Sequence, residues 1–488
     1  MTYVGAAQRF EADLSEGLRG LGIPDWLAAV ADPVRAQAAL TLRIPEFASG
    51  ELTLRECEVE QVRMRGDAWT VRYRLAIEGP EDGSERFCQL CGDLVLPSRE
   101  EPGEVGGGGF GTAGWRCYIP ELRLDLRLEV QDHDADLPSL SLLTDPIEAG
   151  ALLERAIRGS SPAYADFRIQ SSSPRVMRYK PGSRCTILYR LEFPPGCDAR
   201  GWPNPVVAKT HWGDKGRNAY EGMRALWDSE LGRSGAVRIA EPLAFLPELR
   251  VLVQGSIPQE RTLRELIRSS LAAGTPQAVE ELAGYVEKVG VGLAQLHTCG
   301  VRSGVVVTWD DDLAEVRGRV RRAAASMPAL SDAVTPLLDR LDALAARYPP
   351  QPRVPAHRSF RPAQVLLHDG EIGFIDFDGF CQAEPALDLA LFRTTLKDFG
   401  VRMGPEEGER QLDDDVLQKR LRVLDHLCER FLAGYETIAP VSRERVALWE
   451  TLDILSAVLN CWLKVKVERL VYRLSLLRHH LRTTDLGL

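Results

Sequence analysis

The residues best suited to chemistry lie between positions 354 and 390, in the stretch VPAHRSFRPAQVLLHDGEIGFIDFDGFCQAEPALDLA. A polar loop at 357–364 precedes one short apolar segment, and a second apolar segment ends in Asp376-Phe377-Asp378. The Asp369-Gly370 pair between the two segments is typical of a tight β-hairpin turn. Because a hairpin places the residues before its first strand beside those after its second strand, polar groups of the loop should converge on the two carboxylates. Such an oxygen-rich arrangement suits a hard cation such as Mg²⁺.

This stretch resembles the aminoglycoside phosphotransferase and choline kinase family, which has a protein-kinase-like fold. Family members read roughly H-G-D-x-H-P-x-N, then a β-hairpin, then I-D-F/W-D/E and a Gly-Asp-Pro…Asp-Leu-Ala run. The counterparts in this sequence are His357–Gln364, Ile375–Asp378 and Ala383–Ala390, so the register extends over more than thirty residues. The resemblance implies a bilobal α+β protein, in which an antiparallel-sheet lobe binds the nucleotide and a helical lobe carries the catalytic loop and the acceptor pocket.

The resemblance also implies an ATP site upstream of the loop, at Gly182, Ser183, Lys209, Glu221 (with Glu230 as the alternative) and Gln254. Gly182 and Ser183 belong to a polar turn where the family has its nucleotide-covering loop. Lys209, in Val-Ala-Lys, corresponds to the strand lysine that reaches the phosphates, since a triphosphate needs a compact cation on a rigid strand. Glu221 lies on the following helix, where the acid that orients this lysine is expected, and Gln254 lies on the hinge strand between the lobes.

Three positions of the loop depart from the family pattern. Ser359 stands where the family has the Asp that accepts the proton of the attacking hydroxyl, and a serine hydroxyl is far too weakly basic for that task at neutral pH. Gln364 stands where an Asn oxygen normally binds a second Mg²⁺, and Arg358 replaces a Gly. Asp376 remains the best metal ligand, and Asp378 is the candidate substitute base if the acceptor approaches differently.

Three functions are compatible with these residues. The altered loop favours a protein that binds ATP-Mg with weakened or lost phosphoryl transfer, as in a pseudokinase with a binding or regulatory role. Retention of Lys209 and Asp376 favours instead an active kinase that phosphorylates a hydroxyl of a small metabolite, because losing a general base removes only about 10²–10⁴-fold in rate. The third function is an interaction scaffold without nucleotide, for which residues 1–117 would supply the working surface.

The elements that must position these residues follow from periodicity. Alternating apolar segments at 71–77, 122–130 and 186–193 predict strands, whereas the helical period dominates from about 216 onward. Residues 62–79 resemble residues 176–193, which predicts two similar antiparallel sheets unless the likeness of two amphipathic hairpins is accidental. We therefore expect an N-terminal α/β region at 1–117 that is a degenerate repeat of the sheet lobe, a nucleotide-binding lobe at 118–255 and a helical lobe at 256–488.

Composition excludes several classes of protein. The 60 Lys and Arg residues against 70 Asp and Glu residues give a net charge of −10, which argues against nucleic acid or an anionic membrane as a partner. No apolar run approaches the roughly 20 residues of a membrane span, and the N-terminal stretch carries acidic residues where an export signal needs basic and apolar ones. The ten cysteines are scattered rather than framed for disulfides. Together these features predict a cytoplasmic protein.

Overall fold

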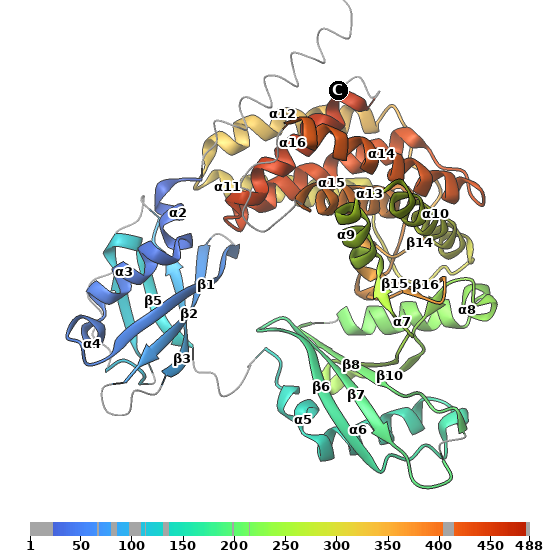
Figure 1. Ribbon diagram of the computed structural model, residues 1–488, viewed down its shortest axis with the longest axis horizontal. Coiled ribbons are helices and arrows are strands. Elements are labelled where there is room, and N and C mark those ends of the chain that lie inside the picture. Colours follow the sequence, from blue (N-terminus) through green and yellow to red (C-terminus); the bar gives the residue numbers. More distant parts are fainter. Residues whose placement is uncertain are drawn as a thin grey trace, which may run out of the picture. The chain divides into compact units, whose positions relative to one another are not determined.

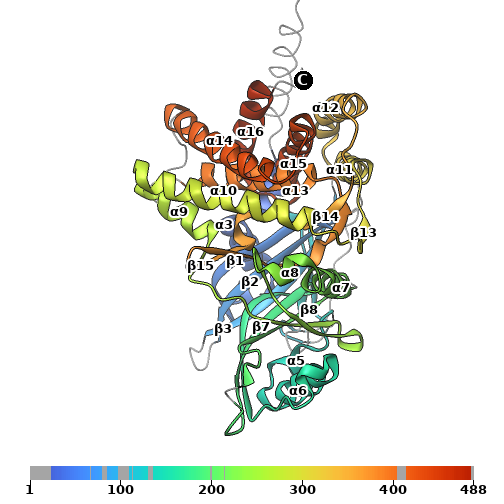
Figure 2. The same cartoon turned by 90° about the vertical axis from the view of Figure 1, so that its right-hand side faces the viewer.

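The structure is a computed structural model that describes residues 23–484, except for 66–67, 80–84, 97–108, 113, 130–135, 198–199, 214 and 404–413. The chain forms two compact units. Unit 1 comprises Met1–Asp132, Leu313–Ala343 and Ile454–Leu488, and unit 2 comprises His133–Asp312 and Leu344–Asp453. Figures 1 and 2 show the elements of each unit in two views.

Unit 1 begins with short helices and an antiparallel sheet, in the strand order β1-β2-β3-β5-β4. The elements are α2 (Asp25–Ala31), α3 (Pro33–Arg43), α4 (Pro45–Ala48), β1 (Thr53–Arg65), β2 (Ala68–Glu78), β3 (Glu85–Leu94), β4 (Arg116–Ile119) and β5 (Leu124–Glu129). Apolar side chains alternate along β2, and Trp69, Val71, Tyr73 and Leu75 are buried. One face of the sheet therefore forms the core, and α2–α4 lie over the sheet (Figure 1).

Unit 2 begins with a second antiparallel sheet, in the strand order β10-β11-β8-β7-β6. Its elements are α5 (Leu140–Thr144), α6 (Pro146–Ser160), β6 (Ser171–Lys180), β7 (Arg184–Glu192), β8 (Val206–His211), α7 (Lys215–Trp227), α8 (Glu230–Ser234), β9 (Arg238–Ile239), β10 (Pro242–Leu246) and β11 (Val251–Gly255). Leu153 and Ile157 of α6 belong to the same buried cluster as Ile187 and Tyr189 of β7. Strand β9 pairs outside this sheet.

The two sheets repeat one another in detail. The order β1-β2-β3-β5-β4 maps onto β6-β7-β8-β11-β10 without rearrangement. In each sheet a Pro-Glu-Leu 3₁₀ turn is followed by an arginine in the left-handed region, Arg123 (φ 52°) in one and Arg250 (φ 52°) in the other. In each, an Asp-Pro pair starts the preceding helix, with Asp32 and Asp145 capping its first N–H groups. The predicted pair of similar sheets is confirmed.

The helical part of unit 2 is built around α10 and α14, which pack closely. Adding a Cβ atom to Gly290 would place it 2.1 Å from the backbone oxygen of Phe431, and one on Gly434 would lie 2.2 Å from the oxygen of Glu287. Only glycine allows so close an approach of two helices. The elements are β12 (Arg261–Thr262), α9 (Leu263–Ala273), α10 (Pro276–Thr298), β13 (Val305–Val306), β14 (Val354–Ala356), β15 (Val365–His368), β16 (Glu371–Phe374), β17 (Cys381–Ala383), α13 (Ala386–Arg402) and α14 (Asp414–Glu436).

The remaining helices are α11 (Trp309–Ala324), α12 (Pro328–Ala345), α15 (Arg443–Leu463) and α16 (Val467–Thr483). By length and composition alone α15 is apolar enough to cross a membrane, contrary to the expectation that no segment would be. However, 72% of its most apolar window is buried inside the protein, as in the core helix of a globular domain. Packing inside the protein thus explains the apolar character of this helix.

The α+β class is confirmed, with an antiparallel-sheet lobe followed by a helical lobe. The structure divides the chain at other points than the expected domain boundaries. The boundary at 117/118 falls within β4, because β4 and β5 complete the first sheet. The segment 256–488 is not one lobe either, since Leu313–Ala343 and Ile454–Leu488 pack with unit 1.

Candidate functional site

The β15–β16 hairpin forms as the sequence predicts. Val365 pairs with Phe374, and His368 pairs with Glu371 across the turn. Asp369 (φ 48°) and Gly370 (φ 75°) both adopt positive φ, as a two-residue type I′ turn requires. The polar loop therefore returns beside the end of β16, as the hairpin argument requires.

Asp388 of α13 holds the backbone of the loop. Its side chain is fully buried and accepts hydrogen bonds from the N–H groups of His357 (2.6 Å) and Arg358 (2.7 Å). This clamp keeps Arg358 at φ 60°, a conformation that a non-glycine residue rarely adopts. Burial lowers the pKa of His357, and its Nε2 lies 3.0 Å from the backbone oxygen of Ile375. The histidine is therefore a neutral structural link between the loop and the hairpin.

A compact ionic cluster joins the sheet of unit 2 to the hairpin of the same unit. Lys209 Nζ lies 3.0 Å from Asp376 Oδ1 and 3.8 Å from Asp378 Oδ1. His211 Nε2 lies 2.9 Å from Asp378 Oδ2, and Arg184 Nη1 lies 3.6 Å from that oxygen. Burial opposes ionisation of Asp376, but Lys209, Gln364 and Arg184 together lower its pKa below the usual value. Asp376 is therefore an ionised carboxylate in a sheltered position.

Ser359 and Gln364 lie against Asp376. The Ser359 hydroxyl is 3.2 Å from His357 Nδ1 and 3.3 Å from the backbone oxygen of Asp376, to which it donates. The Gln364 amide donates to Asp376 Oδ2 at 3.1 Å. Its other amide atom, Oε1, is buried and has no hydrogen-bond partner, and the same holds for Asp378 Oδ1. Two buried oxygens without hydrogen-bond partners, on Gln364 and Asp378, thus accompany the ionised carboxylate of Asp376. Oxygen ligands of this kind fit Mg²⁺.

Three further predicted residues lie on the sheet of unit 2. Gly182 (φ 64°) and Ser183 form the β6–β7 turn, and a Cβ atom at position 182 would lie 2.9 Å from Asp136 Oδ2. The positive φ favours glycine there. Gln254 lies in β11 opposite Val207, is buried, and has a side-chain oxygen without a hydrogen-bond partner. An unpaired buried acceptor at the strand that leads out of the sheet suits a ligand with a hydrogen-bond donor.

Glu221 is not the carboxylate that pairs with Lys209 in the described structure. The side chain is exposed on α7, and the carboxylates beside Lys209 are Asp376 and Asp378. The face of α7 directed at the hairpin carries Asn218, whose amide donates to the backbone oxygen of Phe380 at 2.9 Å. Gly222 lies on the same face, where a Cβ atom would collide with the Phe380 ring. The alternative, Glu230, is engaged with Arg233 instead.

Sequence reasoning missed Arg184, His211 and Arg361. His211 follows Lys209 by two residues on a strand, so the period of two that puts both on one face was an available signal. Arg184 opens β7 beside the predicted turn. Arg361 has exposed surface, yet the atoms crowded around its guanidinium lower its pKa; Asp376 opposes this shift, and Arg184 and Arg178 add to it. Cations therefore gather around the two aspartates.

Part of the chain matches a known protein family. Residues 227–428 match the phosphotransferase enzyme family, a segment that contains the loop, the hairpin and both aspartates. The resemblance to this family is thereby confirmed, and the segment is phosphotransferase-like. No curated protein matches the chain.

Three solved structures have a similar course of the chain. One is a glucosamine kinase in complex with glucosamine, ADP and inorganic phosphate, with a TM-score of 0.47 and 15% identity over 90% of this chain and 98% of that one. The second is a choline/ethanolamine kinase family protein from Mesorhizobium loti (0.44, 13% identity, 70% and 95%). The third is a spectinomycin phosphotransferase in complex with ADP and spectinomycin (0.41, 13% identity, 70% and 99%).

Proposed function

We propose that the protein binds ATP-Mg in unit 2 and transfers phosphate to a small hydroxyl compound slowly or not at all. The observation that carries the proposal is the contact of Lys209 with Asp376 at 3.0 Å, beside side-chain oxygens of Gln364 and Asp378 that accept no hydrogen bond. The cation and the oxygen ligands that a magnesium triphosphate needs are thus gathered in one place. Lys209, Arg184 and Arg361 outnumber the two aspartates, so the cluster favours an added anion.

Each residue has a defined part in this proposal. Asp376, Gln364 and Asp378 would hold Mg²⁺, while Lys209 and Arg184 would turn from the aspartates to the phosphates. Bound Mg²⁺ would supply neutralisation of the charge that develops on the phosphoryl oxygens. Gly182 and Ser183 would cover the nucleotide from the β6–β7 turn.

Two observations favour weak transfer over an ordinary kinase. Ser359 lies where a catalytic carboxylate is needed, and its hydroxyl is engaged with His357 and the Asp376 backbone. Asp378, the candidate substitute, is an ion-pair partner of His211 and Lys209. Both contacts occupy the carboxylate that would have to receive the proton of an acceptor hydroxyl. At the Asp376 end of the hairpin, neither Ser359 nor Asp378 therefore supplies a free base.

Ligand-induced stabilisation tests nucleotide binding. Wild-type protein and Asp376→Asn are compared by thermal shift at millimolar ATP, with Mg²⁺ and with EDTA. We expect a Mg²⁺-dependent rise of Tm that Asp376→Asn abolishes, since asparagine tolerates the left-handed backbone at this position but carries no charge. A chain that shows no shift at all would instead be the scaffold without nucleotide.

Phosphoryl transfer is tested separately. Release of ADP is measured with a panel of amino sugars, aminoglycosides and amino alcohols, classes that the names of the similar structures suggest. Ser359→Asp restores the missing carboxylate and should raise a slow rate by about 10²-fold or more. A wild-type rate typical of kinases, or a fall in Ser359→Asp, would contradict the weak-transfer part while leaving nucleotide binding intact.

A further inference from the structure

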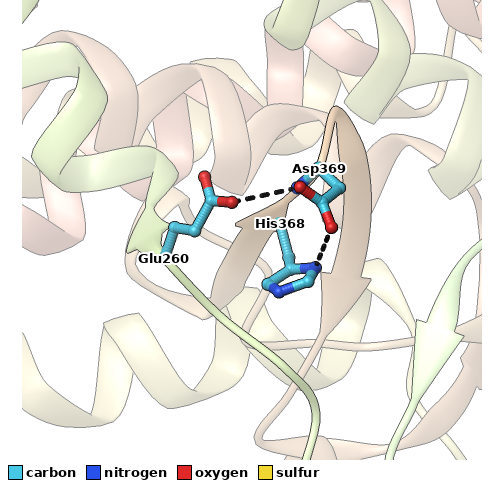
Figure 3. Close-up of side chains that lie close together, drawn as sticks. All are labelled: Glu260, His368 and Asp369. Carbon is cyan, nitrogen blue, oxygen red and sulfur yellow. Dashed lines mark hydrogen bonds and ion pairs between the residues drawn. The ribbon is translucent and has the colours of Figure 1, made fainter.

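Another group of potential ligands lies at the turn end of the β15–β16 hairpin, opposite to the end that carries Asp376. Glu260, His368 and Asp369 bring one imidazole and two carboxylates together (Figure 3). One ligand atom of each residue lies within 4.8 Å of the other two. The two carboxylates lie close enough to repel one another, so the cluster favours a cation between them.

Backbone contacts tie Glu260 to the hairpin that carries His368 and Asp369. The N–H of Glu260 donates to the backbone oxygen of Leu367 at 2.9 Å, one residue before His368. The N–H of Asp369 lies 3.4 Å from Glu260 Oε1. Directly after Glu260, Arg261 pairs with Leu367 in the sheet, and Thr262 starts α9 with a capping box. A site carried by a strand and a tight turn keeps its geometry better than one on free loops.

An independent observation comes from the imidazole. His368 Nδ1 is shielded from solvent and has no hydrogen-bond partner, although Asp369 Oδ2 lies 3.3 Å away at ion-pair distance. A sheltered nitrogen that makes no hydrogen bond is costly. In Figure 3 this nitrogen faces the Asp369 carboxylate, and Glu260 approaches from the neighbouring segment. A metal ion bound by the nitrogen and the carboxylates would satisfy all three groups.

We propose that Glu260, His368 and Asp369 bind a divalent first-row transition-metal ion, with Zn²⁺ and Co²⁺ as the best-fitting ions. Imidazole suits Zn²⁺, Co²⁺ and Ni²⁺, whereas Mg²⁺ takes oxygen ligands and rarely histidine. Metal–ligand bonds of about 2.0–2.2 Å put neighbouring ligands roughly 3–4 Å apart, so small side-chain rotations complete the site. Water would fill the remaining positions.

The bound ion would fasten the segment after strand β11 to the hairpin. That hairpin begins after Gln364 and ends before Asp376, so the metal would stiffen the element that carries the phosphotransferase-like site. The proposal does not depend on nucleotide binding, because none of its three residues takes part in that site.

Metal binding to the full chain tests the site. Co²⁺ and Zn²⁺ are titrated by calorimetry with Mg²⁺ as comparison, and the eight histidines are followed by ¹H–¹⁵N side-chain NMR. We expect one tight equivalent of Co²⁺ that first shifts or broadens the His368 signal. His368→Gln and Asp369→Asn should each weaken the affinity at least tenfold. Asp369→Asn retains the turn, since Asn-Gly is the best type I′ pair.

A matched control decides between this site and others. His426→Gln, at an exposed histidine on α14, should leave the affinity unchanged, whereas Asp376→Asn tests binding of the ion at the proposed nucleotide site instead. The proposal is overturned if His368→Gln binds as tightly as wild type, if Asp376→Asn alone abolishes binding, or if Co²⁺ shows thiolate charge-transfer absorption from the cysteines. Absence of any tight equivalent in the folded wild-type chain would overturn it equally.

Discussion

The two sheets share a framework, but their described charged residues differ: in unit 2 they gather around Asp376 and Asp378, and in unit 1 they do not. Tyr73 of β2 donates to the backbone oxygen of Val30 at 2.8 Å, and Tyr189 of β7 donates to that of Leu143 at 2.7 Å. In both sheets a buried tyrosine thus ties the second strand to the short helix before the Asp-Pro pair, α2 in unit 1 and α5 in unit 2. The strand register then shows which residue of one sheet corresponds to which residue of the other. The residue types differ at the positions that correspond to Lys209, His211 and Arg184.

Lys209 of β8 lies opposite Thr186 on one side and Leu252 on the other. The residue with the equivalent pairs in unit 1 is Asp93, opposite Thr70 and Asp125. By the same register, Val95 of unit 1 occupies the position that corresponds to His211, and Ala68 occupies the position that corresponds to Arg184. Asp93 forms an ion pair with Arg127 at 2.8 Å, whereas Lys209 pairs with the carboxylate of Asp376. The framework survives exchange of its polar residues because the buried apolar face and the turns define it, whereas a phosphate site depends on a few cations.

The largest difference should appear in nucleotide binding. Lys209→Met should abolish the ATP-Mg-dependent rise of Tm, because it removes the cation that is proposed to bind the triphosphate. Asp93→Asn, the matched change in unit 1, should leave the rise unchanged. Thermal shift with and without nucleotide measures both. Equal losses in the two variants would mean that the sheets do not differ in function.

The second difference is in packing. Trp69 of β2 is fully buried, and its indole N–H donates to Ser326 Oγ at 3.2 Å within unit 1. The corresponding residue of β7 is Cys185, which is small and buried. Trp69→Ala should cost about 3–5 kcal/mol of unfolding free energy, whereas Cys185→Ala should cost far less. Chemical denaturation measures the unfolding free energy of both variants. Similar losses would show that the two positions contribute equally to the cores of their sheets.

The shared tyrosine contact should give equal effects. Tyr73→Phe and Tyr189→Phe each remove one buried hydrogen bond to a helix carbonyl, so each should lower the unfolding free energy by about 1 kcal/mol. The two changes act in separate sheets and should add in the double variant. Values that differ by more than twofold would show that the repeat is one of topology but not of energetics.

The smallest effect concerns pH. Burial raises the pKa of both Tyr73 and Tyr189 above its ordinary value. The unfolded chain therefore loses these protons first, and the unfolding free energy should fall as pH rises above about 10. The Tyr73→Phe, Tyr189→Phe double variant should show a flatter decline in alkaline denaturation. If the unfolding free energy of the double variant falls with pH as steeply as that of the wild type, the decline comes from other groups.

The sequence by itself determined the local features of this protein. The Asp369-Gly370 turn, the loop before it and the carboxylates after it follow from short-range rules, since two-residue turns and strand alternation depend on neighbours in the chain. The likeness of the two sheets was also legible, in the hairpins at 62–79 and 176–193. Both survive in the structure because they do not depend on distant contacts.

Only the tertiary structure decided which distant residues meet. It turned α7 so that Asn218, and not Glu221, faces the hairpin, a rotation that the helical period leaves open. It also placed β4 and β5 in the first sheet, and it gave residues 313–343 and 454–488 to unit 1. Apolar helix faces of similar composition can pack against many partners, so the choice among them rests on the shape of the whole core rather than on any short segment.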